Sequence, residues 1–499
     1  MLGGVSAIAF EPISLWPIMP LALALLCALI SRAGSLRQAL LTGWLFGVGQ
    51  FTVGLNWIAT AFTYQAAMPA WLGWVAVVLL SLYLAVYPAL ATGFAWRFGK
   101  DRPLALVLGF AGAWALTEWL RAVVFTGFAW NPLAAAGVAE TRFLVPLIGT
   151  YGASAFVVLF GGAIWLVLER NSRPLLTIAA IGSAAGLIVG YVFEPTRAPG
   201  KAVRIVQPNI GQEDKWRAGF SEEAAQRLAA LSARPGGTRP RLLFWPEAAV
   251  TEPLEDQRSG NHQAFADFER TRAAALVAPG EYLLTGGIAV FSRDGMRVDG
   301  AANSVFLLSP GGKPIARYDK AHLVPYGEYL PMRPLLSAIG LSRLAPGDAD
   351  FRAGPGPRNF DLPGWGKVGL QICYEIIFSG QVVDRRNRPD FIFNPSNDAW
   401  FGRWGPPQHL AQARLRAAEE GIPVIRSTPT GISAIIDARG RVVQALPWRT
   451  AGVIDGHIPA TTPRLTPFAM LGNIIPLALA LALMIAAIAL GPRGRYRTT

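Results

Sequence analysis

Residues 38 to 96 form a stretch without a single Asp, Glu, Lys or Arg. About a quarter of the residues in an ordinary soluble protein are charged, so a stretch of this length without charge is not expected to face water. It is long enough for two membrane-spanning helices of about 20 residues each, with a turn expected at residues 63–69. The chain is therefore predicted to contain an α-helical membrane bundle.

Further apolar runs predict more spans. They lie at about 2–10, 12–31, 103–123, 143–168, 174–193 and 466–490. Together with the two spans in 38–96, the total is about eight. Residues 201 to 460 instead have the composition of an ordinary soluble domain. We therefore expect a transmembrane bundle of about seven spans over 1–195, a globular domain over 196–462, and a final helix with a basic tail over 463–499.

The basic residues beside these spans predict the orientation of the chain. They form four groups: Arg32 and Arg37; Arg97, Lys100 and Arg102; Arg170 and Arg173; and Arg493, Arg495 and Arg497. Counting spans places all four groups on one side, which the positive-inside tendency assigns to the cytoplasm. The globular domain is then expected to face the periplasm from the inner membrane of a bacterial cell.

The net charge of +13 does not by itself predict a nucleic-acid partner. Many Arg residues stand at the ends of apolar runs, where they can contact anionic lipid head groups, and they do not cluster on one helix with aromatic residues. Only two cysteines occur, Cys27 in an apolar run and Cys373 in the globular domain. We expect no disulfide between them, so Cys373 serves packing or chemistry.

The globular domain alternates short apolar segments with helical ones. We predict strands at 202–207, 241–245, 282–290, 303–308, 367–373, 390–394, 423–427 and 432–437, and helices at 221–232, 261–277 and 407–420. This alternation favours a layered α/β domain.

Three polar residues of this domain follow apolar strands. Glu247 ends RLLFWPE, Cys373 ends KVGLQIC, and Lys320 lies in a loop after a predicted strand pair. A carboxylate can take the proton of a thiol, and a nearby ammonium favours the thiolate and can hold an oxyanion. The trio predicts a cysteine nucleophile that needs no histidine base. The four histidines show no metal-ligand spacing, and no metal or cofactor is expected.

Several motifs carry a resemblance to a known family. WPE at 245–247, DKAHLVPYGEYLP at 319–331 and ICYE at 372–375 follow the order of the Glu–Lys–Cys triad of the carbon–nitrogen hydrolase (nitrilase) superfamily. With NDAWFG at 397–402, GPPQH at 405–409 and TGFAW at 126–130, nearly the whole chain resembles the apolipoprotein N-acyltransferase family. The resemblance implies a nitrilase-type αββα sandwich for the globular domain.

The resemblance also implies a reaction. Glu247 would be the general base, Cys373 the nucleophile and Lys320 the group that stabilises the oxyanion. An acyl chain would pass from a phospholipid, typically phosphatidylethanolamine, to the cysteine as a thioester. The α-amine of a diacylglyceryl cysteine on an apolipoprotein would then accept the acyl chain.

Nothing in the sequence requires an oligomer, and we expect a monomer. Two alternatives are a membrane-anchored amidase that uses water as acceptor, and a lipid transporter with an inactive nitrilase-like domain.

Four further residues match family positions. Glu328 would sit beside the nucleophile, Tyr374 would supply a backbone N–H to the oxyanion, Glu375 would shape the site behind the cysteine, and Trp216 would serve substrate access. Two of them have a plainer explanation: Glu328 can be purely structural, and Trp216 can be one of the tryptophans that are ordinary near a membrane surface.

Other candidate residues also have explanations that involve no chemistry. Cys373 can be a core cysteine, Glu247 a surface carboxylate, and Glu118 with Arg121 a pair that holds the bundle together or a head-group site. The apolar segment 329–346 is either a lid that admits acyl chains or an arm docked on the membrane helices.

Overall fold

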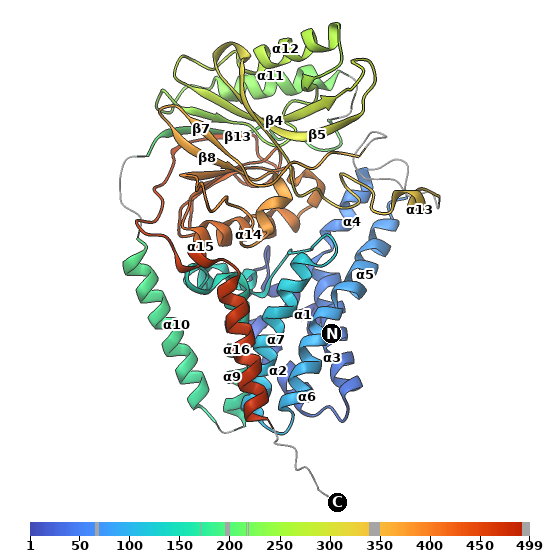
Figure 1. Cartoon of the computed structure of the whole chain (residues 1–499), viewed down its shortest axis with the longest axis vertical. Helices are drawn as coiled ribbons and strands as arrows, with labels where there is room; N and C mark the ends of the chain where they lie inside the picture. The colour runs from blue at the N-terminus through green and yellow to red at the C-terminus, as the bar shows by residue number, and fades with distance from the viewer. Residues whose placement is uncertain are drawn as a thin grey trace, which may run out of the picture. The chain divides into compact units, whose positions relative to one another are not determined.

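The structure of the protein is a computed structural model, and it describes residues 1–64, 69–169, 171–194, 200–215, 217, 219–338 and 350–491. The chain divides into two compact units (Figure 1). One comprises Met1–Ala59, Gly73–Glu194 and Arg464–Thr499, and the other comprises Thr60–Leu72 and Pro195–Pro463. The first unit is helical, and the second contains two β-sheets.

The helices of the first unit follow the apolar runs of the sequence. They are α1 (Leu2–Ser6), α2 (Ile18–Ser31), α3 (Leu36–Gly54), α4 (Trp57–Ala61), α5 (Leu72–Leu84), α6 (Val86–Gly99), α7 (Pro103–Val123), α8 (Val138–Thr141), α9 (Val145–Leu168), α10 (Arg173–Val192), α15 (Pro467–Leu471) and α16 (Ile474–Leu490). Helix α7 packs against α6, α9 and α16. Gly112 permits the approach of α16, because a Cβ there would lie 2.5 Å from the carbonyl oxygen of Ala480.

Four helical stretches of the described residues are long and apolar enough to cross a membrane. They are Leu72–Gly99, Pro103–Val123, Val145–Leu168 and Arg173–Val192. The pair Leu36–Gly54 and Trp57–Tyr64, bent by 44°, would make a fifth. The expected count of about eight is not confirmed. Helix α1 has only 5 residues, and α2 and α16, with 14 and 17, are shorter than a typical span of about 20 residues. Residues 65–68, within the expected turn at 63–69, lie outside the described part.

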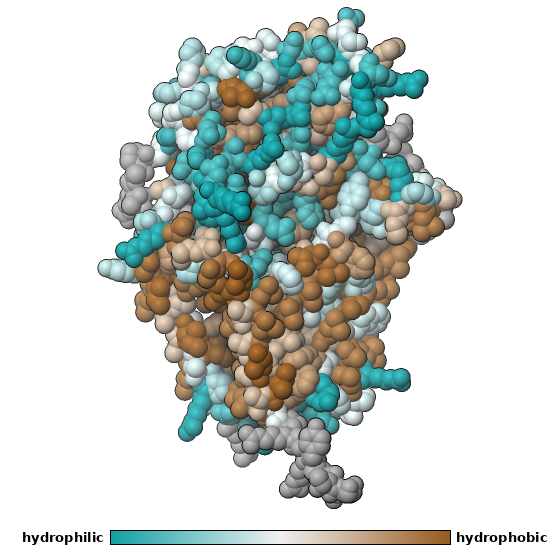
Figure 2. All heavy atoms as spheres, in the orientation of Figure 1, coloured by the Kyte–Doolittle hydropathy of each residue, from teal (hydrophilic) through white to brown (hydrophobic). Residues whose placement is uncertain are grey.

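The outer surface of these helices is apolar. Figure 2 shows hydrophobic side chains over most of their visible face. Large exposed residues occur on several helices, including Leu21, Leu25, Leu41, Leu45, Leu79, Leu187, Ile188, Leu481 and Ile485. Soluble proteins rarely expose so much contiguous apolar surface, whereas a helix satisfies its own backbone groups and tolerates hydrocarbon. The first unit therefore has the surface of a membrane bundle.

Two sheets form the second unit. The first contains β1 (Ala202–Gln207), β2 (Leu242–Phe244), β3 (Pro253–Asp256), β4 (Tyr282–Phe291), β5 (Gly300–Leu308), β6 (Pro314–Asp319) and β13 (Gly452–His457), in the order β13-β1-β2-β4-β5-β6 with β3 beside β4. The second contains β7 (Asn359–Leu362), β8 (Gly366–Leu370), β9 (Phe391–Pro395), β10 (Val424–Ser427), β11 (Ala434–Ile436) and β12 (Val442–Ala445), in the order β12-β11-β10-β9-β8-β7. Strands β1, β2 and β4 run parallel, as do β8, β9 and β10.

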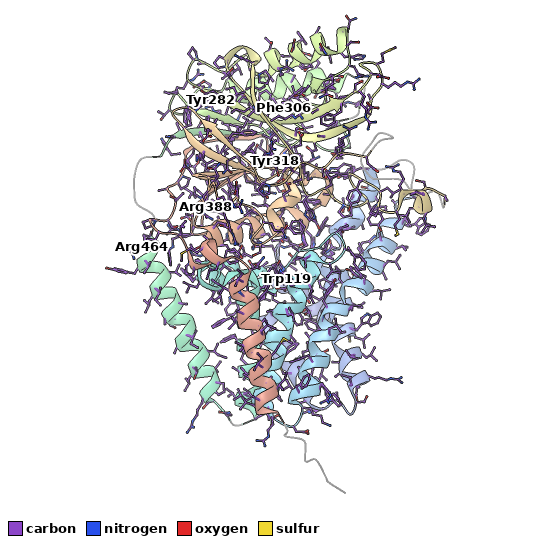
Figure 3. All side chains as sticks on the ribbon, viewed as in Figure 1. Trp119, Tyr282, Phe306, Tyr318, Arg388 and Arg464 are labelled. Atoms are coloured by element: carbon purple, nitrogen blue, oxygen red, sulfur yellow. The ribbon has the colours of Figure 1, made fainter. Side chains whose placement is uncertain are left out.

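Two apolar cores hold the layers of this unit together. Phe244 of the first sheet and Phe393 of the second meet at 4.8 Å between ring centroids, within the core between the sheets. Helices α11 (Phe220–Ser232) and α12 (Asn261–Ala273) cover the other face of the first sheet, and α14 (Gly405–Glu420) packs on β10. Tyr318 belongs to the core between the sheets and Phe306 to the core under the helices (Figure 3). The layers therefore follow the order α, β, β, α.

The eight predicted strands and three predicted helices of this unit are confirmed within a few residues. Strands β3, β6, β7, β12 and β13 were not predicted. Their sequences mix apolar with polar or charged residues, and β12 is exposed along its whole length. Such edge strands carry little of the apolar signal that marks a buried strand.

Candidate active site

Glu247 lies just beyond the carboxyl end of β2. The chain keeps pairing with β4 up to this point, because Trp245 N–H donates to Leu284 O at 2.9 Å and Gly286 N–H donates to Pro246 O at 3.2 Å. Gly286 is needed here, since a Cβ on it would lie 2.6 Å from the backbone nitrogen of Ala248 and 2.7 Å from the Cα of Glu247. Glu247 is only 5% exposed, so it is not the surface carboxylate of the plainer explanation.

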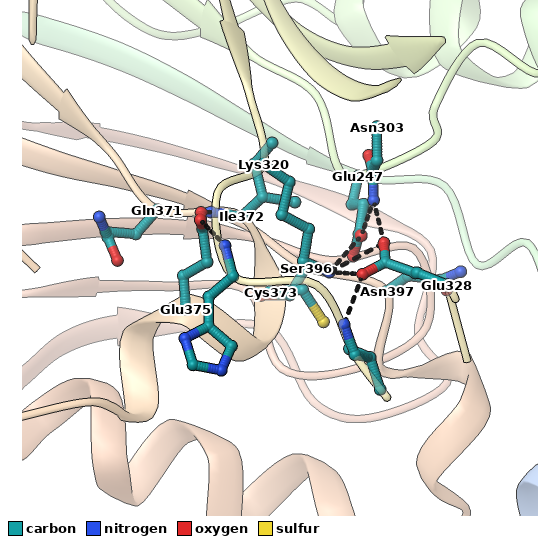
Figure 4. Close-up of polar contacts among 12 residues, drawn as sticks. Glu247, Asn303, Lys320, Glu328, Gln371, Ile372, Cys373, Glu375, Ser396 and Asn397 are labelled. Carbon is teal, nitrogen blue, oxygen red and sulfur yellow. Dashed lines mark hydrogen bonds and ion pairs between the residues drawn. The ribbon is translucent and has the colours of Figure 1, made fainter. Parts of the chain in front are cut away.

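Lys320 follows the end of β6 and points at two carboxylates. Its Nζ lies 3.0 Å from Glu328 Oε2 and 3.6 Å from Glu247 Oε1 (Figure 4). The residue is 1% exposed, so it is not a solvated loop lysine. Burial alone would lower the pKa of Lys320, but Glu328, Glu247 and Cys373 outweigh it and raise that pKa above its ordinary value. The side chain stays an ammonium.

Asn303, on β5, joins the two carboxylates. Its Nδ2 donates to Glu247 Oε1 at 2.7 Å and to Glu328 Oε1 at 2.8 Å. Glu328 Oε2 also accepts from Val324 N–H at 2.8 Å. The sequence analysis missed Asn303. The available signal was an amide in an otherwise small and apolar strand, opposite the end of β6.

Cys373 occupies a sharp turn after β8. Its φ of +51° lies in the left-handed region, where a residue with a Cβ is strained by about 1–3 kcal/mol. Its carbonyl lies 3.1 Å from His409 Nε2, and the backbone N–H of Asn397 donates to its sulfur. Glu247 and Lys320 both act on the pKa of its thiol, and Figure 4 draws the three side chains in one group. Cys27 and Cys373 are both free, as expected.

The thiol of Cys373 is neutral at rest. Burial raises its pKa well above the ordinary value, Glu247 and Asp398 raise it further, and Lys320 and the Asn397 N–H lower it. A base must therefore remove the proton before the sulfur can attack. The carboxylate of Glu247 is available to accept it, because its Oε2 has no hydrogen-bond partner among the described residues.

Glu375 ties the Lys320 loop to the cysteine turn. Its Oε1 accepts from Tyr318 OH at 2.9 Å, Ala321 N–H at 2.7 Å and His322 N–H at 3.0 Å, and its Oε2 accepts from Ile372 N–H at 2.6 Å. Burial raises the pKa of Glu375 to about 7, against these donors. The neighbouring ring of Tyr374 is buried, and it meets the rings of His322 and Phe378 edge-on.

A buried polar network supports the cysteine turn from behind. His409 Nδ1 lies 2.9 Å from Asp398 Oδ1, and Arg426 Nη2 donates to both oxygens of Asp398 at 2.7 and 2.8 Å. All three residues are inaccessible to solvent. Burial lowers the pKa of His409, and Arg426 lowers it further. His409 is thus hydrogen-bonded inside the domain, and it also contacts the nucleophile's backbone.

The remaining candidates fall elsewhere. Trp216 lies outside the described residues, as does 339–349 of the apolar segment. Glu118 Oε1 accepts from Leu133 N–H at 2.9 Å, and Arg121 donates to Trp130 O at 2.7 Å, so both bind the segment after α7.

Over the described ranges no group of three or more His, Cys, Asp or Glu residues could hold a metal ion. A thiol, a carboxylate with a free oxygen and a fixed ammonium can together perform nucleophilic acyl transfer.

Comparison with known proteins agrees with this chemistry. Residues 2–163 match the model of the apolipoprotein N-acyltransferase N-terminal domain, and residues 202–467 match that of the carbon-nitrogen hydrolases. An apolipoprotein N-acyltransferase of Rhodopseudomonas palustris is 34% identical, over 99% of this chain and 94% of the relative. Relatives of the same name from Sinorhizobium medicae and Caulobacter vibrioides are 37% and 36% identical, over 90% and 89% of this chain and 86% and 85% of their own.

Proposed function

The chain belongs to the apolipoprotein N-acyltransferase family, within the carbon–nitrogen hydrolases, and we propose that its buried site passes the acyl chain through Cys373. The family match includes the helical unit as well as the α/β domain, which favours acyl transfer over a membrane-anchored amidase. The protein is thus an acyltransferase, and the residue roles below are proposals.

In the first half-reaction, Glu247 accepts the thiol proton and the sulfur attacks the ester carbonyl of a phospholipid. The charge on the carbonyl oxygen is held by Lys320 Nζ and the backbone N–H of Tyr374. The carbon–oxygen bond then breaks, and the departing lysophospholipid alcohol takes the proton from Glu247. A thioester on Cys373 remains. Phosphatidylethanolamine is the donor that we propose, following the family resemblance.

In the second half-reaction, the α-amine of the diacylglyceryl cysteine of an apolipoprotein attacks the thioester. Glu247 takes a proton from the attacking nitrogen, the carbon–sulfur bond breaks, and the sulfur recovers that proton. An amide forms and the enzyme returns to its resting state. Water is the competing acceptor, so a site in which Glu247, Lys320 and Cys373 are all at most 5% exposed favours transfer over hydrolysis. We propose that a monomer suffices.

One observation carries this proposal: a buried ammonium lies 3.6 Å from a carboxylate, at the strand ends where the strained cysteine turn also lies. The test is incubation of the purified enzyme with a fluorescent phospholipid, followed by addition of a diacylglyceryl lipopeptide. We expect a hydroxylamine-sensitive acyl group on Cys373 that the lipopeptide removes as an amide. Release of free fatty acid at the same rate with or without lipopeptide would instead support an amidase-like hydrolase. Full acylation by Cys373→Ala would refute the role of the sulfur.

We also propose about eight spans, with the second unit in the periplasm. Support comes from the ends of the helices in the first unit. Trp96 Nε1 donates to Ala33 O at 2.7 Å, and Gly491 lies against the backbone of Phe98, so the C-terminal ends of α2, α6 and α16 meet at one end of this unit. Basic residues follow each of these three helices in the sequence. Maleimide labelling tests this: Glu213→Cys should react in cells with a permeable outer membrane, and Lys100→Cys only after the inner membrane is opened. The reverse pattern would refute it.

A further inference from the structure

A second lysine, Lys215, is buried near the reacting groups without a partner. It lies in the loop between β1 and α11 and is 6% exposed, as little as Glu247 and Cys373. Its Nζ has no hydrogen-bond partner in the part of the chain that the structure describes. Lys320 differs, since its ammonium is matched by two carboxylates. The two buried ammonium groups of this domain therefore differ: that of Lys320 has carboxylate partners, and that of Lys215 has none among the described residues.

The loop of Lys215 belongs to the active site. Gln212 Oε1 accepts from Asn397 Nδ2 at 3.2 Å, and the backbone N–H of Asn397 donates to the sulfur of Cys373. The titratable groups that act on the pKa of Lys215 are Glu247 and Cys373. Burial lowers the pKa of Lys215 to about 8, although both of these groups oppose the shift. The side chain is therefore mostly an ammonium at neutral pH.

A buried ammonium without an acceptor is unfavourable, because it has lost its water and gained no hydrogen bond. Glu247, whose carboxylate acts on the pKa of Lys215, does not relieve it, because neither Lys215 Nζ nor Glu247 Oε2 has a hydrogen-bond partner among the described residues. An acceptor that arrives with the substrate would satisfy the ammonium and explain why the loop holds it there.

We infer that Lys215 binds the phosphate of the phospholipid acyl donor, an inference that rests on the proposed function. Only a few bonds separate the scissile ester of a glycerophospholipid from its phosphate, so a donor whose carbonyl reaches Cys373 carries an anion beside it. Lysine binds phosphate as a point charge with three donors. The same cation repels the protonated amine of the lipopeptide, so the empty site favours the donor.

The test is a comparison of two donors with the same acyl chains, a phosphatidylethanolamine and a diacylglycerol, in Lys215→Met and the wild type. The measured quantity is the rate of thioester formation on Cys373. Lys201→Met is the matched control, because Lys201 is exposed just before β1. We expect Lys215→Met to slow acylation by the phospholipid on the order of tenfold to a hundredfold and to change that by the diacylglycerol less than about threefold. Lys215→Arg should restore much of the phospholipid rate.

Equal slowing with both donors would overturn the inference and place Lys215 at the reacting atoms or in the fold. Unchanged rates with both would overturn it as well. The melting temperature separates the fold from binding: without donor, Lys215→Met should melt no lower than the wild type, since it loses a buried charge that had no partner. The proposed function fails on a different result, the absence of any acyl-Cys373 in the wild-type enzyme.

Discussion

The ammonium of Lys320 and the carboxylate of Glu328 lie 3.0 Å apart in the interior of the α/β unit. Glu328 also accepts from Asn303 Nδ2 and Val324 N–H, so both of its oxygens are engaged. Glu247, the other carboxylate beside the ammonium, keeps one oxygen free. The two glutamates thus have different roles. Glu328 holds the ammonium of Lys320 in place, and Glu247 has an oxygen that can accept and return a proton.

Glu328→Gln should preserve the shape of the site and lower the pKa of Lys320. Glu328 is the strongest of the charges that raise that pKa, so without it the ammonium loses its proton at a lower pH. We expect the alkaline limb of the kcat/KM profile to move to lower pH, with a fall in kcat of about tenfold. Glu255→Gln, a more exposed glutamate paired with Arg317, is the control and should leave the profile unchanged. An unshifted limb in Glu328→Gln would show that Glu328 does not control Lys320.

Gly286→Ala should displace Glu247. The added Cβ would meet backbone atoms of Glu247 and Ala248 below 3 Å, and backbone cannot rotate away. The adjacent Gly287→Ala is the matched control, because its Cβ would meet only the flexible side chain of Leu254. Both variants should melt at a lower temperature because the strand becomes overpacked. Only Gly286→Ala should also lose most of its kcat, by about tenfold or more. Equal losses of kcat would mean that activity follows stability alone.

The sequence predicted the parts of the site that lie at the ends of apolar strands. Glu247 and Cys373 follow apolar strands, Lys320 follows the mixed strand β6, and the family motifs mark all three. Asn303 was not predicted because it lies inside a strand, and its hydrogen bond to Glu247 depends on the pairing of β5 with β6.

Lys215 was not predicted from the sequence for a related reason. A lysine in a polar loop normally lies in water, and only the three-dimensional path of the loop shows that it is buried. In the membrane bundle, hydropathy found the helices, and four or five of the expected spans are long and apolar enough in the described residues to cross a membrane. Apolar composition does not show that α1 stops after 5 residues and gives way to a 3₁₀ turn.

Asn303→Leu should remove the hydrogen-bond donor that Glu247 and Glu328 share. Glu247 Oε1 then loses this hydrogen bond, and the carboxylate is no longer held where it can take the thiol proton. The kcat/KM of acyl transfer should therefore fall by about tenfold to a hundredfold. Ser304→Ala serves as the control on the same strand, because Ser304 donates to Asp319 outside the reacting group. An unchanged kcat/KM in Asn303→Leu would show that Glu247 does not depend on Asn303.

Alkylation of Cys373 should report on Lys320 directly. The buried thiol has a pKa well above its ordinary value, so iodoacetamide should modify the resting enzyme slowly at pH 7 and faster as pH rises. Lys320 is the neighbouring cation that lowers this pKa, so Lys320→Met should slow alkylation further at each pH. Acyl transfer should fall by about a hundredfold or more with loss of the oxyanion donor.

Lys313→Met is the control for the Lys320→Met variant, since Lys313 is exposed just before β6. Mass spectrometry of the Cys373 peptide follows the reaction, and a Cys27→Ala background removes the second thiol. Faster alkylation in Lys320→Met than in Lys313→Met would mean that the lysine shields the sulfur and does not activate it.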